Sequence, residues 1–334
     1  MSTIGAVSKI GAIRERLVAR LRLHTWHWSA TVRQAIERSR YRPRTGISSA
    51  DLEILLDLES AGIHVTSLSR LGLPGTDQLL EHAAVWRNRL VTEAGSGDGP
   101  SFAILADPPE LASRSPELLL WGLQDRLFDI LESYTRLSLR CLNVAVRRDL
   151  ADGTEHSTRR WHIDINDFRY LKIIVYLNDV GDDGGPFEYL PDCHSRSLLR
   201  SGQPKSVDPA RLSEFGDQPW RTCSGPAGTT ILVDTARLYH RGKSPQQERF
   251  TVFYSFASHH PRRPDLCSAA QFPLARLNLP LGKAQAERLD WPEGSGWWNI
   301  PGWCGVKKSD TRSRRNLQSW PQIRLRRGEP SPPG

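Results

Sequence analysis

Five short runs of strand-forming residues follow one another in the middle of this 334-residue chain. They are rich in Val, Ile, Leu, Tyr and Phe, and they cover residues 137–146, 170–177, 187–190, 229–233 and 250–256. Clusters of Gly, Asp and Pro separate them. Many short strands divided by turn residues are typical of an all-β sandwich or barrel. The sequence therefore predicts a mainly β core over residues 136–260.

Helical patterns precede this core. Ser48 and Ser49 are N-cap residues in front of a run with apolar residues at helical spacing, which predicts a helix that ends near Gly62. Residues 76–93 and 115–134 predict two further helices. We therefore expect helices to flank the strands within one domain that covers residues 47–275.

The two ends of the chain carry most of its excess positive charge. The formal net charge is +8, and Lys and Arg are concentrated in residues 9–44 and 307–327. Apolar residues at helical spacing predict a basic amphipathic helix over residues 6–23, which can lie on a membrane surface or pack on its own domain. We expect residues 1–46 to form a helical N-terminal extension and residues 276–334 a Trp-, Pro- and Arg-rich C-terminal extension.

The cysteine content indicates a reducing compartment. The 5 cysteines are scattered and include no CxxC pair, which argues against a disulfide framework and against a structural zinc site. No stretch approaches the ~20 apolar residues of a membrane-spanning helix, and the first residues do not resemble a secretory signal. We expect a cytoplasmic protein.

Two histidines and one aspartate form a candidate metal site. His162 and Asp164 are two residues apart just before the run 170–177, so on an extended segment their side chains point to the same side. A second histidine, His240, follows the run 229–233. Two imidazoles and one carboxylate on one face of an octahedron leave three positions open, which is the arrangement of non-haem Fe(II) oxygenases. Those positions can take a bidentate 2-oxoacid and then O₂.

Further polar residues occur where a 2-oxoacid would need them. Arg249 opens the run 250–256, and its planar guanidinium suits the far carboxylate of such a molecule. Thr251 lies on the same face of that strand. Tyr176 could line the pocket or bond the co-substrate, although an aromatic residue in a strand is more often part of the core. Asn143 and Arg147, on one face of the run 137–146, could reach the co-substrate or the substrate, and a structural role is at least as common.

These motifs resemble the phytanoyl-CoA dioxygenase family. The resemblance is carried by the His-x-Asp pair, by L-K-I-I-V-Y-L-N-D-V at 171–180, by G-G-P-F-E-Y-L-P-D-C-H at 184–194, and by G-P-A-G-T-T-I-L-V-D at 225–234 with His240 and Arg249. It implies a double-stranded β-helix (jelly-roll, cupin-like) core. It also implies Fe(II), 2-oxoglutarate and O₂ as requirements, with ascorbate as a stimulant. His162, Asp164 and His240 would bind the iron, and Arg249 the 2-oxoglutarate carboxylate.

The resemblance also bears on the reaction. Related halogenases replace the ligand Asp with a small residue, so the presence of Asp164 favours hydroxylation. We expect a dioxygenase that hydroxylates a small or carrier-tethered molecule, and the basic balance suits an anionic one. Two alternatives stay open. The basic ends suit an oxygenase that acts on nucleic acid, although no set of base-stacking aromatics marks such a site. A jelly-roll module without catalysis is the other.

Overall fold

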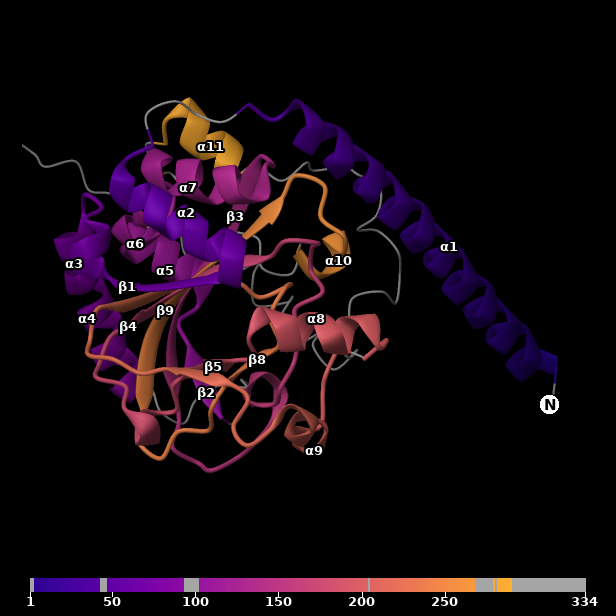
Figure 1. Cartoon of the computed structure of the whole chain (residues 1–334). Helices are drawn as coiled ribbons and strands as arrows, with labels where there is room; N and C mark the ends of the chain where they lie inside the picture. Colours follow the sequence, from indigo (N-terminus) through magenta and orange to yellow (C-terminus); the bar gives the residue numbers. More distant parts are fainter. Residues whose placement is uncertain are drawn as a thin grey trace, which may run out of the picture. The chain divides into compact units, whose positions relative to one another are not determined.

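The computed structural model of the chain describes residues 3–42, 47–92, 102–203, 205–267, 279 and 281–289. The chain divides into two compact units, Met1–Glu293 and Gly294–Gly334, and the described residues all belong to the first. Two antiparallel sheets form the strand-rich part of this unit, with helices beside the larger sheet (Figure 1). The prediction of a strand-rich core with flanking helices is therefore confirmed.

Within the described residues, the larger sheet has six strands, and every neighbouring pair is antiparallel. In spatial order they are β1 (Ile63–Ser67), β7 (Thr229–Asp234), β4 (Leu171–Tyr176), β9 (Arg249–Ser258), β3 (Leu139–Asp149) and β2 (Ala103–Leu105). The smaller sheet has the order β6 (Arg221–Cys223), β5 (Phe187–Tyr189), β8 (His240–Gly242). An isolated bridge between His162 and His240 places one more extended segment beside β8.

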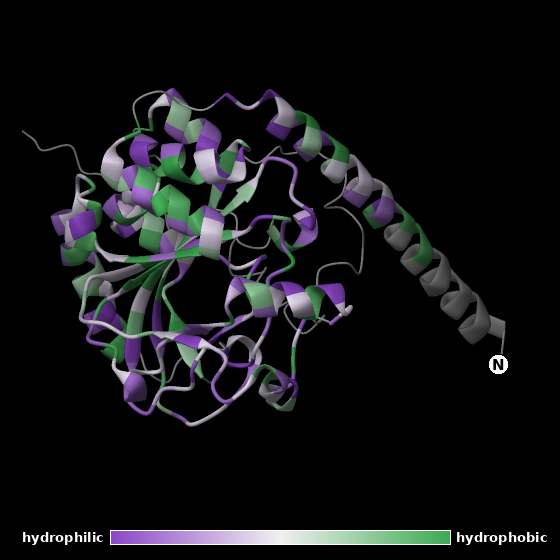
Figure 2. Cartoon of the chain, viewed as in Figure 1, coloured by the Kyte–Doolittle hydropathy of each residue, from purple (hydrophilic) through white to green (hydrophobic). Residues whose placement is uncertain are grey.

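Helices cover one face of the larger sheet and build the main core with it. Among the described residues, the helices with side chains in this core are α2 (Ser49–Ala61), α3 (Leu68–Leu71), α4 (Thr76–Thr92), α5 (Pro108–Arg114), α6 (Pro116–Trp121), α7 (Asp125–Thr135) and α11 (Lys283–Leu289). Figure 2 shows hydrophobic residues gathered where α2 and its neighbouring helices meet the strands. Burial of this apolar surface is the dominant stabilising contribution to folding. The opposite face of the sheet packs part of its surface in a second, smaller hydrophobic cluster, which includes Ile174, Tyr176, Ile231 and Val233.

Side-chain alternation along the strands separates the helix-side core from the opposite face. In β9, Val252 and Tyr254 belong to the core, whereas Phe253 and Ser255 line a cavity on the other side. β3 carries a bulge that shifts its register between Cys141 and Asn143. Such an extra residue reverses which side chains face which way. The bulge therefore lets Asn143 face the cavity although Cys141 faces the helices.

The N-terminal helix is longer than the sequence predicts. The apolar pattern indicates residues 6–23, but α1 spans Thr3–Arg40. Its second half contacts the rest of the unit: Trp26 donates to the carbonyl of Pro261, and the buried Gln34 bonds Asp167 and Ser258. Polar anchors of this kind have no hydrophobic periodicity, so the sequence pattern stops before them. No helix among the described residues is long and apolar enough to cross a bilayer.

Several shorter elements were not predicted. The region 115–134 forms two helices, α6 and α7, and a side chain at Gly122 between them would overlap the ring of Tyr254. The remaining elements are α8 (Asp192–Arg200), α9 (Pro209–Leu212), α10 (Pro264–Cys267) and the 3-10 turns η1 (Ser157–Arg159), η2 (Asp182–Gly184) and η3 (Ser213–Phe215). Of the predicted C-terminal extension, only residue 279 and residues 281–289 are described.

Candidate functional site

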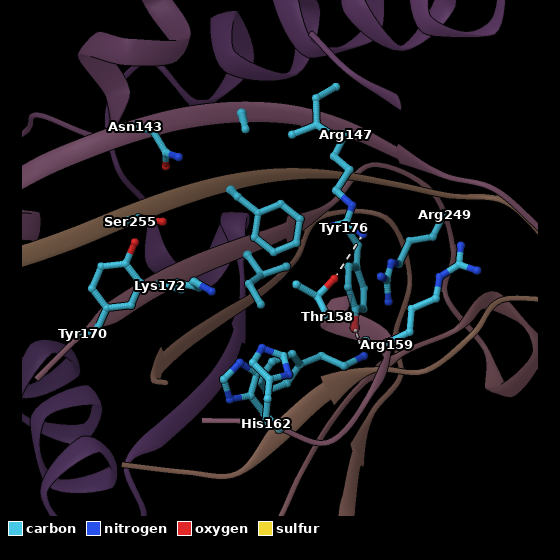
Figure 3. A pocket seen from close by; sticks show the side chains of 17 residues that line it. Asn143, Arg147, Thr158, Arg159, His162, Tyr170, Lys172, Tyr176, Arg249 and Ser255 are labelled. Carbon is cyan, nitrogen blue, oxygen red and sulfur yellow. Dashed lines mark hydrogen bonds between the residues drawn. The ribbon is translucent and has the colours of Figure 1, made fainter. Parts of the chain in front are cut away.

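A cavity of about 230 Å³ lies between the inner face of the larger sheet and the smaller sheet. Alternate residues of β3, β4 and β9 line one side, and residues of β5, β8 and the turn η1 line the other. Figure 3 shows His162 at one wall, with Tyr170, Lys172, Ser255 and Asn143 toward one end of the cavity. The guanidinium groups of Arg147, Arg159 and Arg249 lie toward the other end (Figure 3).

The three predicted metal ligands meet at this cavity. One donor atom from each of His162, Asp164 and His240 lies within 4.8 Å of the other two. The two histidines are held side by side because each backbone N–H donates to the carbonyl of the other, at 3.0 and 2.8 Å. The backbone N–H of Asp164 donates to the carbonyl of Thr235 at 2.9 Å. Backbone pairing therefore sets the spacing of all three side chains.

Both imidazoles present a free nitrogen toward Asp164. The Nδ1 of His162 donates to the carbonyl of Arg160 at 2.7 Å, and the Nδ1 of His240 donates to the carbonyl of Leu238 at 2.9 Å. Each Nε2 therefore keeps its lone pair, and these atoms lie 3.9 and 3.8 Å from the carboxylate oxygens of Asp164. Burial lowers the pKa of His240 to about 3 and also lowers the pKa of His162. Two neutral imidazoles fixed in this way fit a divalent transition metal.

Asp164 has a cationic neighbour that sequence reasoning did not assign to it. The ammonium of Lys172, on β4, lies 2.7 Å from Oδ2 of Asp164. Burial by itself would raise the pKa of Asp164, but the charge of Lys172, with smaller effects from the two histidines, holds it well below its usual range. Asp164 is therefore ionised and able to act as an anionic ligand.

Arg249 lies at the far end of the cavity, in a buried ion-pair cluster. Its guanidinium donates to Asp149 from Nη2 at 2.9 Å and from Nε at 3.2 Å, and also to the carbonyl of Gly185. Arg147 donates to the same carboxylate. Burial would raise the pKa of Asp149, but the two arginines lower it below its usual value. Asp149 thus fixes both guanidinium groups at the cavity wall.

The remaining predicted residues lie close to this cluster or along the strands. Thr251 is on the cavity face of β9, and its buried hydroxyl has no hydrogen-bond partner among the described residues. Tyr176 lines the cavity, but its hydroxyl already donates to the carbonyl of Cys223 and accepts from the N–H of Phe187. Asn143 lines the cavity at the end away from Arg249, as Figure 3 shows.

Charge distinguishes the lining of this cavity. Four cationic side chains belong to it, and none of its lining residues is an Asp or a Glu. Sequence reasoning assigned roles to Arg249 and, more weakly, to Arg147, but it missed Lys172 and Arg159. Arg159 lies in the turn η1, where it is buried and donates to the carbonyls of Phe102 and Leu150. An arginine in a loop carries no periodic signal, so only the fold could bring it to the site.

No family model and no curated protein matches this sequence. Solved structures that resemble the chain include HygX from Streptomyces hygroscopicus with nickel and 2-oxoglutarate bound, at 20% identity and a TM-score of 0.41 over 62% of this chain and 86% of that one. EctD from S. alaskensis, with 2-oxoglutarate and 5-hydroxyectoine, has 17% identity and a TM-score of 0.45 over 66% and 84%.

A third similar structure is SnoN, described as a non-heme alpha ketoglutarate dependent epimerase from nogalamycin biosynthesis. It has 17% identity and a TM-score of 0.43 over 63% of this chain and 83% of that one. Likenesses at these values carry no argument about what this chain does.

Proposed function

We propose that this protein is an Fe(II)- and 2-oxoglutarate-dependent dioxygenase. The observation that carries the proposal is the donor set at the cavity wall. His162 and His240 offer Nε2 lone pairs, Asp164 is ionised beside them, and all three donor atoms lie within 4.8 Å of one another. Two imidazoles and one carboxylate with open positions toward a cavity are the ligand type of non-haem Fe(II) oxygenases.

The opposite end of the cavity fits the far carboxylate of 2-oxoglutarate. Three arginines gather there, and two aspartates pair with them: Asp149 with Arg147 and Arg249, and Asp152 with Arg159. The three arginines and two aspartates together carry one net positive charge, which a single carboxylate would balance. Arg249 and the unpartnered hydroxyl of Thr251 would bind it, with Arg147 and Arg159 close by.

The two ends of the cavity would then have separate roles. His162, Asp164 and His240 would hold the metal, and Arg249 would hold the co-substrate so that its oxoacid end faces the metal. Bound iron with 2-oxoglutarate and O₂ supplies the oxidising power, and the co-substrate leaves as succinate and CO₂. Buried walls such as Tyr176 and Phe187 would keep water out, which strengthens the electrostatic contacts inside.

We assign the strand arrangement to the double-stranded β-helix class and the reaction to hydroxylation. The first rests on two antiparallel sheets that enclose the cavity between them. The second rests on Asp164, because the carboxylate occupies the position that a halide would need. A small or carrier-tethered molecule remains the proposed substrate, in agreement with the size of the cavity.

The proposal is tested by anaerobic titration of the protein with Fe(II) and then 2-oxoglutarate. A bidentate 2-oxoacid on Fe(II) gives a weak visible charge-transfer band, which we expect for the wild-type protein. Asp164→Ala should lower metal affinity by more than the ~10–100-fold that loss of an outer-shell partner costs. Arg249→Ala should retain the metal and weaken 2-oxoglutarate binding by about 2–5 kcal/mol, the cost of truncating a buried charged partner.

Two exposed residues supply matched controls. Asp217→Ala and Arg221→Ala remove the same groups from the surface and should leave both affinities unchanged. If the wild-type protein gives no band, or if Asp164→Ala and Arg249→Ala bind metal and co-substrate as the controls do, the assignment of the site is wrong.

A further inference from the structure

The end of the cavity away from the arginines has its own polar groups. Lys172 pairs with Ser255 across β4 and β9, whereas Tyr176 pairs with Thr251, nearer Arg249. Four residues along a strand correspond to ~13 Å, so Lys172 and the arginine cluster lie at separate ends. Figure 3 shows the same division, with Lys172, Tyr170, Ser255 and Asn143 on one side. Of these four side chains, only Lys172 is charged.

The anionic partner of Lys172 is a proposed metal ligand. The ammonium of Lys172 lies 2.7 Å from Oδ2 of Asp164, and it lies over the ring of Tyr170, 5.5 Å from the ring centre. Among the described residues, no other carboxylate pairs with it. A divalent metal bound to Asp164 would repel the ammonium and would take up the negative charge of the carboxylate that Lys172 now pairs with. Lys172 would then share its one carboxylate partner among the described residues with a divalent cation, and its own charge would no longer be offset.

The sum of charges in a site that holds the metal and 2-oxoglutarate also leaves the charge of Lys172 without compensation. A divalent metal, the Asp164 carboxylate and the oxoacid carboxylate of 2-oxoglutarate sum to zero. The arginine end is neutral once the far carboxylate is bound. Lys172 then adds one positive charge that nothing in the lining offsets, because the lining contains no Asp or Glu. An unpaired charge in a buried site is costly, so a bound anion there is strongly favoured.

Asn143 adds a second constraint on the molecule that would fit. Its Oδ1 atom is buried without a hydrogen-bond partner among the described residues, and Asn143 lines the cavity at the same end as Lys172. A ligand at this end therefore meets the ammonium of Lys172 and the unpartnered carboxamide oxygen of Asn143.

We propose that the substrate is a carboxylate-bearing small molecule whose carboxylate pairs with Lys172 beside the metal, while Asn143 bonds a polar group next to it. A single uncompensated positive charge matches a monoanionic carboxylate better than a phosphate dianion. This inference rests on the proposed function, because it assumes that iron and 2-oxoglutarate occupy the rest of the cavity.

Benzoate and benzamide are suitable probes because they share a shape and differ in charge. The protein is loaded anaerobically with Fe(II) and saturating 2-oxoglutarate, and the paramagnetic relaxation of the probe's ring protons is measured by NMR. The Zn(II)-loaded protein gives the diamagnetic reference. We expect benzoate to bind at least about 10-fold more tightly than benzamide, the usual scale for a hydrogen bond to a charged group.

Variants separate Lys172 from the other cations. Lys172→Met should abolish the preference for benzoate and keep the charge-transfer band of the iron–2-oxoglutarate chelate. Lys172→Gln, which keeps a polar group, provides the same test if the first variant does not fold. Lys243→Met is the matched control, because that ammonium bonds the carbonyl of Asp182 and is not part of the cavity lining. It should bind both probes as the wild-type protein does.

Three results would overturn the inference: no preference for benzoate in the wild-type protein, a preference that survives in both Lys172 variants, or loss of 2-oxoglutarate binding in those variants. The last result would assign Lys172 to the co-substrate. The absence of the chelate band in the wild-type protein is a different outcome, because it contradicts the proposed function itself.

Discussion

Arg249 is oriented by acceptors that the protein itself supplies. Asp149 and the carbonyl of Gly185 hold the guanidinium, and Gly242 on β8 leaves room beside it. A Cβ atom built at Gly242 would lie 2.9 Å from Nη2 of Arg249. Real Cβ contacts are not this short, so a side chain at this position has to push the guanidinium away from its place.

We therefore expect Gly242→Ala to weaken 2-oxoglutarate binding and to leave metal binding intact. Overpacking costs typically ~1–3 kcal/mol, and here the displaced group is the proposed carboxylate partner. Anaerobic titrations of Fe(II) and 2-oxoglutarate measure the two affinities separately. Gly181→Ala is the control, because a Cβ at Gly181 would meet nothing within 4 Å. Equal co-substrate affinities in the two variants would show that the position of the guanidinium does not matter.

At the scale of elements, the positions of the strands could be predicted from the sequence, but the pairing between strands could not. The five runs of strand-forming residues correspond to β3, β4, β5, β7 and β9, with ends shifted by up to three residues. His162 and Asp164 were predicted to point the same way because two residues on one extended segment share a side, and their donor atoms do lie within 4.8 Å of each other. The ion pair of Arg249 with Asp149 was not predicted, because it depends on the register between β9 and β3. Register follows from burial and turns across the whole sheet.

The second half of α1 is attached by a contact that the sequence pattern does not show. Hydrophobic periodicity located only the first part of α1, whereas a polar residue attaches its second part. The carboxamide of Gln34 donates to Asp167 at 2.8 Å, and both residues are buried. Burial raises the pKa of Asp167, although hydrogen bonds from Ser258 and Gln34 act in the opposite direction. A buried polar contact over this sequence distance leaves no local pattern to recognise.

We expect Gln34→Ala to lower the free energy of unfolding by about 1–3 kcal/mol at neutral pH, the cost of leaving a buried polar group short of a partner. The raised pKa of Asp167 means that its ionised form is disfavoured in the folded state. Stability from this group is therefore lost as the pH rises from its unfolded pKa through its folded pKa. Removing a donor to the carboxylate enlarges this loss. The destabilisation should be greater at pH 7.5 than near pH 4.

Urea unfolding of the wild-type protein and the variant at both pH values measures this difference. Gln78→Ala is the matched control, because Gln78 is exposed on α4. A destabilisation by Gln34→Ala that is equal at the two pH values would mean that the carboxylate of Asp167 is not involved.

At the scale of the whole molecule, the cysteines report on whether the unit is folded. Cys141, Cys223 and Cys267 are buried free thiols, and Cys193 is an exposed one. The three buried thiols come from separate parts of the unit: Cys141 from β3 in the helix-side core, Cys223 from β6 in the smaller sheet, and Cys267 from α10. Burial raises the pKa of Cys141 and of Cys223 to about 12 and that of Cys267 well above its usual value.

Alkylation needs both access and the thiolate, and the buried thiols lack both at pH 8. We therefore expect iodoacetamide to modify Cys193 in the folded protein within minutes, while Cys141, Cys223 and Cys267 stay protected. Peptide mapping by mass spectrometry over a urea series follows each thiol separately. If the unit unfolds as one cooperative body, the three protected thiols should become reactive together, at the urea concentration where the far-ultraviolet circular dichroism is lost. Earlier exposure of Cys223 alone would instead mean that the smaller sheet opens independently of the helix-covered one, and the cavity between them would then open without global unfolding.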